Sequence, residues 1–391
     1  MKDHKFFSII PYKDHLLQLE NPVKAMAYYK NYAIDLLSGM RFPFDFSQWI
    51  SSLEEKTLFS YEERPRVIHL FYELGFLIEN EFHLVDEDTL LVLDCEFGSY
   101  KKIVPDHFKK IHLTLLSAPD FDQYTKAFEE GFEDLLKGNC YQFNLTYPYL
   151  YSFHPKHSPL DFIYSLWKNP IHRGQYGSAT YIPFFKKMFL SNSPECLFQL
   201  KGPKLSTMPI KGTIKREKDK DWKELWKSLK QDKKSQAELF MISDLLRNDL
   251  SRIEKPLAKI VKKKFPKLVP GLLHQCAQVD VRLSSKVNLW QILTKLYPGG
   301  SITGAPKLRA MRLIHKLENR ERGFYCGSTV ILFKKMKSAS INIRSSTLKF
   351  DEFEGQLIYQ AGGGITLLSQ TEDEYKEMTY KVESFIDTLT L

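Results

Sequence analysis

The spacing of hydrophobic and polar positions changes several times along the chain and predicts a mixture of helices and strands. Over residues 120–136, aromatic and leucine side chains recur every three to four positions, which predicts an amphipathic helix. Gly138 ends that pattern, and residues 141–146 alternate with period two, as in a half-buried strand. A helical period returns over residues 235–251. We therefore expect mixed α and β structure.

The first 115 residues show a less regular pattern. Pro22 near the start of residues 21–37 predicts a helix there, because proline suits a first helical position. Residues 67–77 and 90–93 are apolar runs typical of buried elements. No cluster of catalytic residue types is visible in this part. We therefore expect residues 1–115 to be an N-terminal portion, which forms one compact unit with a catalytic core over residues 116–391.

Towards the C-terminus, residues 323–333 and 338–348 are expected to form paired strands. Within the second strand the run Ile341-Asn-Ile-Arg344 alternates, which would send Asn342 and Arg344 to one face. An arginine on such a face could address an anionic ligand.

A final helix is expected to start at Thr371. Thr371 and Glu374 have the spacing of a capping box, which would be a structural reason for that glutamate. Glu374, Glu377 and Lys381 lie at i, i+3 and i+7, however, so they project from one helix face. The capping box explains the presence of Glu374 but not that of Glu377 and Lys381.

A small-residue loop within residues 297–311 could bind an anion. It offers backbone freedom and hydroxyl groups, followed by Pro306 at an expected helix start, and its residues of interest are Gly299, Gly300, Ser301, Thr303 and Gly304. Free N–H groups at a helix start favour negative charge. The alternative is an ordinary tight turn before a helix. Gly362, Gly363 and Gly364 form a second candidate cradle of the same kind.

Composition narrows the classes of protein. Of 391 residues, 43% are hydrophobic and 26% charged, which is typical of a globular chain. The net charge of +9 sits largely in lysine runs without the interleaved aromatics of a nucleic-acid module, so we expect no nucleic-acid partner. No apolar run is long enough to span a membrane, and no signal peptide is visible, which predicts a cytoplasmic location without membrane contact. The five cysteines lack C-x-x-C spacing, which argues against a zinc site and disulfides.

Several other polar residues are candidates for chemistry. Lys211 lies in an extended segment between Ile210 and Gly212, where a strand needs no cation; the alternative is a surface lysine on an edge. Gln142 shares its face of the expected strand with another amide and could address a polar ligand or be a satisfied core residue. His274 follows a proline-glycine turn and is more often a structural residue than a catalyst.

Carboxylates on two expected helices point to a metal. Glu238 lies near the start of the helix over residues 235–251, and Glu374 and Glu377 lie on the last helix. Carboxylate oxygens are the ligands that Mg²⁺ prefers, completed by water and substrate. Glycine N–H groups and an arginine suit a substrate that carries carboxylates of its own. Together these residues predict a Mg²⁺ site for an acidic small molecule.

The order and spacing of these motifs resemble the chorismate-utilising enzymes from about residue 120 to the C-terminus. The resemblance is carried by Pro209-Ile-Lys-Gly-Thr213, Ala237-Glu238 with Ser243-Asp-Leu-Leu-Arg-Asn-Asp249, Pro298-Gly-Gly-Ser-Ile-Thr-Gly-Ala-Pro-Lys307, Tyr325-Cys-Gly-Ser328, Ile341-Asn-Ile-Arg344 and Ala361-Gly-Gly-Gly364. It implies an α+β fold in which two antiparallel β-sheets pack face to face with helices outside.

Two positions discriminate between members of that family. Members that add water have a lysine where this chain has Gln142, and members that form anthranilate have an alanine where it has Lys211. The resemblance therefore implies Mg²⁺-dependent amination of chorismate to 4-amino-4-deoxychorismate, for 4-aminobenzoate and folate synthesis. Anthranilate formation and a catalytically silent relative remain the alternatives.

The resemblance also implies roles for individual residues. Lys211 would be the nucleophile, Glu195 the general acid, and His274 a further catalytic residue. Mg²⁺ would be held by Glu238, Glu374 and Glu377. The substrate would be bound by Gln142, Ser301, Thr303, Arg344, Gly362, Gly363, Gly364 and Lys381.

Finally, the resemblance implies partners. A separate glutaminase subunit would deliver ammonia, and a separate aminodeoxychorismate lyase would act on the product. Residues 17–21 match only part of the Leu-Leu-Glu-Ser element that binds tryptophan in relatives, so residues 1–115 are expected to hold a vestigial tryptophan pocket.

Overall fold

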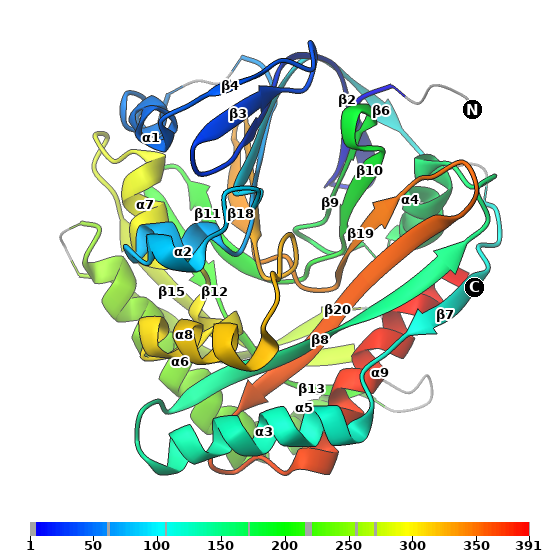
Figure 1. Ribbon diagram of the computed structural model, residues 1–391. Helices are drawn as coiled ribbons and strands as arrows, with labels where there is room; N and C mark the ends of the chain where they lie inside the picture. Colours follow the sequence, from blue (N-terminus) through cyan, green and yellow to red (C-terminus); the bar gives the residue numbers. More distant parts are fainter. Residues whose placement is uncertain are drawn as a thin grey trace.

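The computed structural model describes residues 5–60, 63–105, 108–170, 173–215, 221–254, 257–269 and 272–390. Strands contribute most of the architecture (Figure 1). They are β1 (Phe7–Tyr12), β2 (His15–Tyr28), β3 (Tyr32–Asp35), β4 (Arg41–Pro43), β5 (Arg66–Leu70), β6 (Val92–Ile103), β7 (Leu113–Ser117), β8 (Gln142–Phe153), β9 (Ser178–Ile182), β10 (Lys187–Ser191), β11 (Cys196–Lys201), β12 (Lys204–Met208), β13 (Ile210–Lys215), β14 (Lys259–Val269), β15 (Leu272–Arg282), β16 (Gly304–Ala305), β17 (Ser328–Phe333), β18 (Met336–Ser340), β19 (Ser345–Lys349) and β20 (Gly355–Ile365).

Helices lie outside these strands (Figure 1). They are α1 (Phe46–Glu54), α2 (Leu74–Ile78), α3 (Phe121–Leu136), α4 (Pro159–Trp167), α5 (Trp222–Gln231), α6 (Lys233–Ser251), α7 (Leu289–Leu296), α8 (Lys307–Glu318) and α9 (Thr371–Thr390), with 3₁₀ turns η1 (Phe82–Leu84), η3 (Pro183–Phe185) and η4 (Gly300–Ile302). The expected helix over residues 120–136 is confirmed as α3. Asp120 begins it by accepting a hydrogen bond from the Gln123 backbone N–H at 2.6 Å. The helix expected over residues 235–251 is confirmed as α6.

The strands pair into one continuous antiparallel network with two arms. The first arm runs through β14, β15, β12, β11, β18, β17, β5, β6 and β2. β1 pairs with the other edge of β2 and leads into the second arm, β9, β10, β19, β20, β8 and β7. Strands from the N-terminal residues thus pair directly with strands from the core, as β5 does with β17.

The two arms pack face to face. A buried cluster between them contains Val67 from β5, Leu93 from β6 and Phe189 from β10. A buried histidine links the arms with polar contacts: His69 Nδ1 lies 2.9 Å from Thr329 Oγ1, and its Nε2 lies 2.7 Å from Thr180 Oγ1. The expected α+β fold, with two antiparallel layers and helices outside, is confirmed.

Two further apolar clusters attach the helices to the outer faces of the arms. One includes Leu239 of α6 and Leu293 of α7 against Val279 of β15. The other includes Phe128 of α3 and Phe385 of α9 against strands β8 and β20. α6 and α9, which carry the predicted carboxylates, are therefore each anchored by an apolar stripe on an arm of the sheet.

The helix expected over residues 21–37 is wrong, because β2 continues through this segment to Tyr28. Asn21 has a left-handed φ of 54°, and the register against β6 shifts between Pro22 and Lys24. Ala25 and Ala27 beyond this irregularity are fully buried between polar or half-exposed neighbours, which is the period of a strand. Non-local pairing with β6 overrides the local helix signal.

The single strand expected over residues 338–348 is also wrong. β18 ends at Ser340 and β19 begins at Ser345, because the chain crosses from the first arm to the second between them. Arg344 has a φ of 51° in this crossing, so it does not share a strand face with Asn342. Similarly, residues 323–327 precede β17 as a turn.

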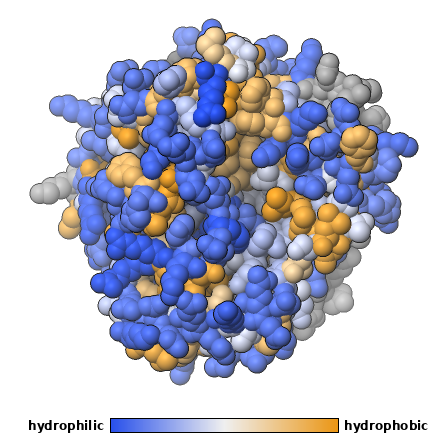
Figure 2. All heavy atoms as spheres, viewed as in Figure 1, coloured by the Kyte–Doolittle hydropathy of each residue, from blue (hydrophilic) through white to orange (hydrophobic). Residues whose placement is uncertain are grey.

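The surface carries apolar side chains in small groups among polar ones, as the face in Figure 2 shows. None of the helices in the described ranges is long and apolar enough to cross a membrane. All five cysteines are buried and unpaired, which confirms that they are small core residues.

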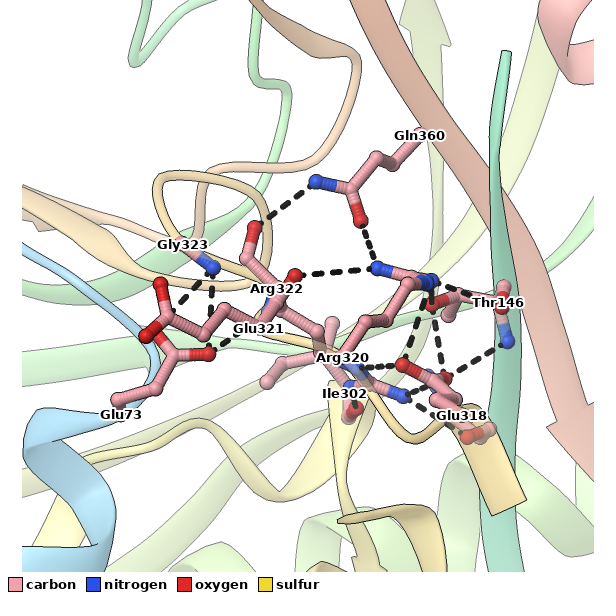
Figure 3. Close-up of polar contacts among 10 residues, drawn as sticks. Glu73, Thr146, Ile302, Glu318, Arg320, Glu321, Arg322, Gly323 and Gln360 are labelled. Carbon is pink, nitrogen blue, oxygen red and sulfur yellow. Dashed lines mark hydrogen bonds and ion pairs between the residues drawn. The ribbon is translucent and has the colours of Figure 1, made fainter. Parts of the chain in front are cut away.

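Glu73 gives the fold a distinct pH dependence. Its carboxylate accepts hydrogen bonds from the backbone N–H of Arg322 at 2.7 Å and of Gly323 at 3.2 Å. Burial, and then the neighbouring charge of Glu321, raise its pKa to about 7 (Figure 3). The folded state thus keeps a proton that the unfolded state releases near pH 4.5.

We expect Glu73→Gln to remove part of the pH dependence of stability. The contribution of Glu73 to the free energy of unfolding is complete below pH 4.5 and is lost as the pH rises to about 7, by roughly 3 kcal/mol. Denaturant unfolding at pH 5 and pH 7.5 would show a flatter profile for Glu73→Gln than for wild type. The exposed Glu54→Gln serves as control, and an unchanged profile for Glu73→Gln would contradict the assignment.

Candidate functional site

The glycine loop folds differently from a simple helix start. Gly300–Ile302 forms the turn η4, and Gly304–Ala305 forms the short strand β16, which pairs with Phe143 and Gln142 of β8. A Cβ at position 304 would lie 2.0 Å from the Gln142 carbonyl oxygen, so this close approach requires glycine. Pro306 lies just before the first residue of α8, and the loop reaches the helix only through β16. The loop therefore places Ser301 beside β8.

Lys211 and Glu238, which the sequence analysis named as separate candidates, lie together. Lys211 Nζ is 3.9 Å from Glu238 Oε2, and both side chains are largely buried, at 11% and 15% exposed. Lys211 comes from β13 and Glu238 from α6. Gly212 next to the lysine has a φ of 78°, and a Cβ there would collide with the Ser235 side chain. The local backbone thus needs glycine for α6 to approach β13 this closely.

Glu195 is a buried carboxyl in the same cluster. It is 4% exposed, and burial raises its pKa above the usual range. The Ser301 hydroxyl beside it, the charges of Lys211 and Lys267, and the Ile210 backbone N–H act in the opposite direction. Glu195 Oε1 has no hydrogen-bond partner. A carboxyl that keeps its proton to higher pH and has a free oxygen suits proton donation.

Lys267 is a functional candidate that the sequence reasoning missed. Its Nζ donates a hydrogen bond of 2.7 Å to the carbonyl oxygen of Pro194, the residue before Glu195. In the sequence it belongs to a lysine-rich stretch that resembles a solvated face. Only the pairing of β14 with β15 reveals its position near the site, because Lys267 lies directly opposite His274 in that register.

We expect Lys267→Met to shift the pH dependence of catalysis. Loss of this cation removes a charge that lowers the pKa of Glu195, so the alkaline limb of the kcat/KM profile moves to higher pH. Release of the Pro194 carbonyl lowers kcat/KM by about tenfold, since it loosens the segment that carries Glu195. Lys267→Arg restores the charge and is the matched control. A Lys267→Met profile that overlays wild type would contradict this role.

His274 is neutral and has one free nitrogen. Its Nδ1 lies 2.8 Å from Thr213 Oγ1, and its Nε2 is buried without a hydrogen-bond partner. Burial, followed by the charges of Arg344, Lys267 and Lys381, lowers its pKa to about 3. The proline-glycine turn used to interpret His274, residues 270–271, lies outside the described residues. The neutral imidazole can accept or donate one hydrogen bond at Nε2.

The three glycines of residues 362–364 lie within strand β20 and pair with Asn144–Thr146 of β8. They form a flat strand surface, which differs from the separate loop expected from the sequence. A Cβ on Gly364 would lie 2.6 Å from Gln142 Nε2 and 3.0 Å from Asn144 Oδ1. The absence of side chains therefore leaves room in front of these two amides.

The remaining loop hydroxyls differ from each other. The Thr303 hydroxyl donates to the Gly299 carbonyl at 3.0 Å, so it closes the loop itself. The Ser301 hydroxyl is buried without a partner, and the Asn144 side-chain N–H donates to the Ser301 carbonyl at 3.2 Å. Ser301 thus has the hydroxyl available for a ligand.

Helix α9 brings its three predicted residues to β20. Lys381 Nζ donates to the Gly362 carbonyl at 2.7 Å and lies 2.9 Å from Glu377 Oε1. A Cβ on Gly363 would lie 3.1 Å from Glu374 Oε2 and 3.9 Å from Lys381 Nζ. Thr371 is the first residue of α9, one position later than the N-cap of a capping box, and the Glu374 carboxylate accepts a hydrogen bond from Ser369 Oγ at 2.6 Å.

Arg344 is a cation without an anionic partner. Within the described ranges no ion pair includes its guanidinium, and burial lowers its pKa from the usual value. It lies near enough to His274 for its charge to affect that imidazole. A largely buried arginine of this kind is suited to a carboxylate ligand.

The carboxylates fit Mg²⁺ by donor type. In the part of the chain that the structure describes, no three His, Cys, Asp or Glu side chains are close enough to hold a metal by themselves. Glu374 is buried, whereas the Glu377 side chain is 57% exposed. Mg²⁺ commonly takes one or two protein carboxylates and completes its shell with water and substrate oxygens. One or two of the three carboxylates Glu238, Glu374 and Glu377 could therefore be the protein ligands.

Residues 79–387 match the family of chorismate binding enzymes. The chain belongs to this family. Aminodeoxychorismate synthase component 1 of Escherichia coli is 35% identical to this chain over 276 residues, which are 68% of the chain and 58% of that relative. The chain therefore spans little more than half the length of this curated relative.

Other comparisons relate the chain to different members of the family. Anthranilate synthase component 1 of Aquifex aeolicus is 30% identical over 318 residues, or 76% of the chain and 62% of that protein. The crystal structure of anthranilate synthase component I from Streptococcus pneumoniae superposes with a TM-score of 0.76, covers 96% of this chain and 92% of its own, and is 23% identical. The last comparison shows the fold.

Proposed function

We propose that this chain is an aminodeoxychorismate synthase component I, which aminates chorismate to 4-amino-4-deoxychorismate with ammonia and Mg²⁺. The family membership supports chorismate as the substrate class. The similarity to aminodeoxychorismate synthase component 1 and the lysine at position 211 support this branch of the family.

The observation that carries the proposal is a set of buried polar atoms, on predicted site residues and their neighbour Asn144, that have no hydrogen-bond partners. Glu195 Oε1, His274 Nε2 and Ser301 Oγ belong to it, and the remaining members are Gln142 Nε2 and Asn144 Oδ1. Buried polar groups are normally paired, so such a set is expected to bind a polar ligand. Arg344 and Lys381 add positive charge beside it, as a dicarboxylate requires.

The chemistry assigned to the chain's own residues starts at Lys211. Its amine adds to ring carbon 2 of chorismate, and both conjugated ring double bonds shift as the hydroxyl at carbon 4 leaves. Glu195 gives its proton to that hydroxyl, which departs as water. Ammonia then adds at carbon 4, and Lys211 is released from carbon 2. Arg344 and Ser301 would bind the carboxylate of the enolpyruvyl group.

Mg²⁺ would be held by one or two carboxylates from the set Glu238, Glu374 and Glu377, together with water and substrate oxygens, and it would neutralise the ring carboxylate of chorismate. We propose that ammonia comes from a separate glutaminase subunit, and that a separate aminodeoxychorismate lyase consumes the product to give 4-aminobenzoate.

Chorismate consumption tests whether the chain is an ammonia-using member. Purified protein is incubated with chorismate in four mixtures that contain or omit ammonium and Mg²⁺, with products separated by chromatography. We expect consumption to require both. Formation of isochorismate without ammonium would contradict the interpretation of Gln142, and no consumption in any mixture would favour a catalytically silent relative.

A further inference from the structure

A buried ion pair lies outside the set of groups that would touch the substrate. Arg322 is 2% exposed, and its guanidinium donates to both oxygens of Glu318, from Nε at 3.0 Å and from Nη2 at 2.6 Å. Figure 3 shows this pair between the end of α8 and strand β8. Opposite charges in contact keep both groups ionised: the neighbouring arginines lower the pKa of Glu318, and Glu318 raises that of Arg322.

The remaining N–H groups of Arg322 reach two walls of the site. Nη1 donates to the Ile302 carbonyl at 2.9 Å, and Nη2 donates to the Asn144 carbonyl at 2.9 Å. Ile302 lies between Ser301 and Thr303 in the loop, and Asn144 is the β8 residue whose amide faces Gly364. One planar group therefore binds the backbone of the loop at Ile302 and the backbone of β8 at Asn144.

Glu318 extends the contact along β8. Its Oε1 accepts hydrogen bonds from the backbone N–H of Thr146 at 2.9 Å and from the Thr146 hydroxyl at 2.8 Å. Removing two charges from water is costly, and such pairs often add little to stability compared with apolar side chains of the same shape. A fork of N–H donors in fixed directions, however, sets the geometry of its acceptors.

We propose that Arg322 is a positioning residue for the substrate site, which fixes the Ile302 and Asn144 carbonyls and so holds the Ser301 hydroxyl and the Asn144 amide in place. This positioning role depends on the proposed function only for the identity of the ligand, chorismate. Lysine cannot reproduce this fork, because its ammonium is a single point donor.

Arg320 offers a matched control two residues away. It donates to the Thr146 carbonyl at 2.9 Å and to Gln360 Oε1 at 2.6 Å, and it lies 3.3 Å from Glu318. No contact joins it to Ile302 or Asn144 among the described residues. Loss of Arg320 therefore disturbs Thr146 of β8 and Glu318 but releases no hydrogen bond to the loop of residues 299–304.

A cleft gives access to the position of the Arg322 side chain. Arg322 lines a cavity of about 270 Å³ together with Tyr72, Glu73 and His315. If Arg322 is truncated to alanine, free guanidinium can enter the space that its head group leaves. Rescue by guanidinium separates a missing donor fork from a general loss of folding.

The test compares Arg322→Lys, Arg322→Ala and Arg320→Lys with wild type. Hydrogen–deuterium exchange is measured without ligand for peptides that cover residues 299–304 and 142–146, and thermal unfolding confirms that each variant is folded. We expect faster exchange of both segments in the two Arg322 variants, and wild-type exchange of residues 299–304 in Arg320→Lys, because Arg320 contacts Thr146 but not the loop. A folded Arg322→Lys with unchanged exchange in both segments would overturn the proposal.

The functional arm uses chorismate with Mg²⁺ in the absence of ammonia. We expect the dissociation constant of chorismate to rise by about tenfold in Arg322→Lys and Arg322→Ala, since a small displacement of contact groups has a cost of this order. Millimolar guanidinium should lower the value again in Arg322→Ala, whereas sodium chloride at equal ionic strength should not. Unchanged affinity in both variants would also overturn the proposal.

Failure of the proposed function and unfolding of the Arg322 variants can both be distinguished from failure of the positioning role. If wild type does not bind chorismate, the proposed function fails, and the exchange of residues 299–304 still decides the role of Arg322. If both Arg322 variants are unfolded, Glu318→Gln decides it, because that change keeps the shape of the pair and removes the anion that orients the fork. Unchanged exchange in folded Glu318→Gln would then overturn the proposal.

Discussion

Replacement of Lys211 by methionine is expected to abolish amination of chorismate, with a loss of roughly 10³-fold or more in kcat, as for removal of other catalytic nucleophiles. Methionine keeps the apolar stem in the pocket, where the Lys211 side chain is 11% exposed, and removes the amine. The protein should therefore stay folded and still bind chorismate. The rate of chorismate consumption at saturating ammonium is the measurement.

Two controls define this result. Lys211→Arg keeps a cation beside Glu238 but supplies no nucleophile, so it should be as inactive as Lys211→Met. Lys204→Met changes a half-exposed lysine on β12 and should leave the rate unaltered. Wild-type turnover in Lys211→Arg would show that position 211 needs only a positive charge, which contradicts covalent attack.

Replacement of Glu195 by glutamine is the second large effect. Glutamine matches the carboxyl in shape but cannot give up a proton, so kcat should fall by about 100- to 10 000-fold. The expected pH profile has a definite sign. Because burial raises the pKa of Glu195, wild type stays protonated and active above the usual carboxyl range and loses activity as the pH rises through that pKa.

The residual activity of Glu195→Gln should lack this alkaline limb. The measurement is kcat/KM against pH for wild type and variant under identical ionic strength. Retention of the limb in Glu195→Gln would assign it to another group and remove Glu195 as the acid.

Short-range pattern was sufficient for helices α3 and α6, because the spacing of their apolar residues fixes one face of each helix. The contact of Lys211 with Glu238 depends on the packing of α6 against β13, and in the sequence only the resemblance to the chorismate-utilising enzymes assigned both residues to one site. The motifs over residues 209–213 and 361–364 also lie on strands that line the site.

Features that depend on distant pairing could not be predicted. Residues 21–28 look helical locally but pair with β6, about seventy positions later. Arg344 lies near enough to His274 for its charge to lower the pKa of that imidazole, because the chain crosses between the two arms at residues 341–344, which an alternating sequence pattern does not reveal. The position of Lys267 opposite His274 can be recognised only once the β14–β15 register is known.

The Arg322–Glu318 ion pair beside the site could not be predicted for a different reason. Glu318 ends α8 and Arg322 follows it, in a charged stretch that resembles a solvated turn in the sequence. Their burial follows from the packing of α8 on β8, which no local period reports.

The identity of the aminated product tests the central claim most directly. Wild-type protein is incubated with chorismate, ammonium and Mg²⁺, with and without added aminodeoxychorismate lyase, and the aromatic products are identified. The account predicts 4-aminobenzoate in the presence of the lyase and no aromatic amine in its absence. Anthranilate formed without the lyase would contradict it, because it would place nitrogen at carbon 2 despite Lys211.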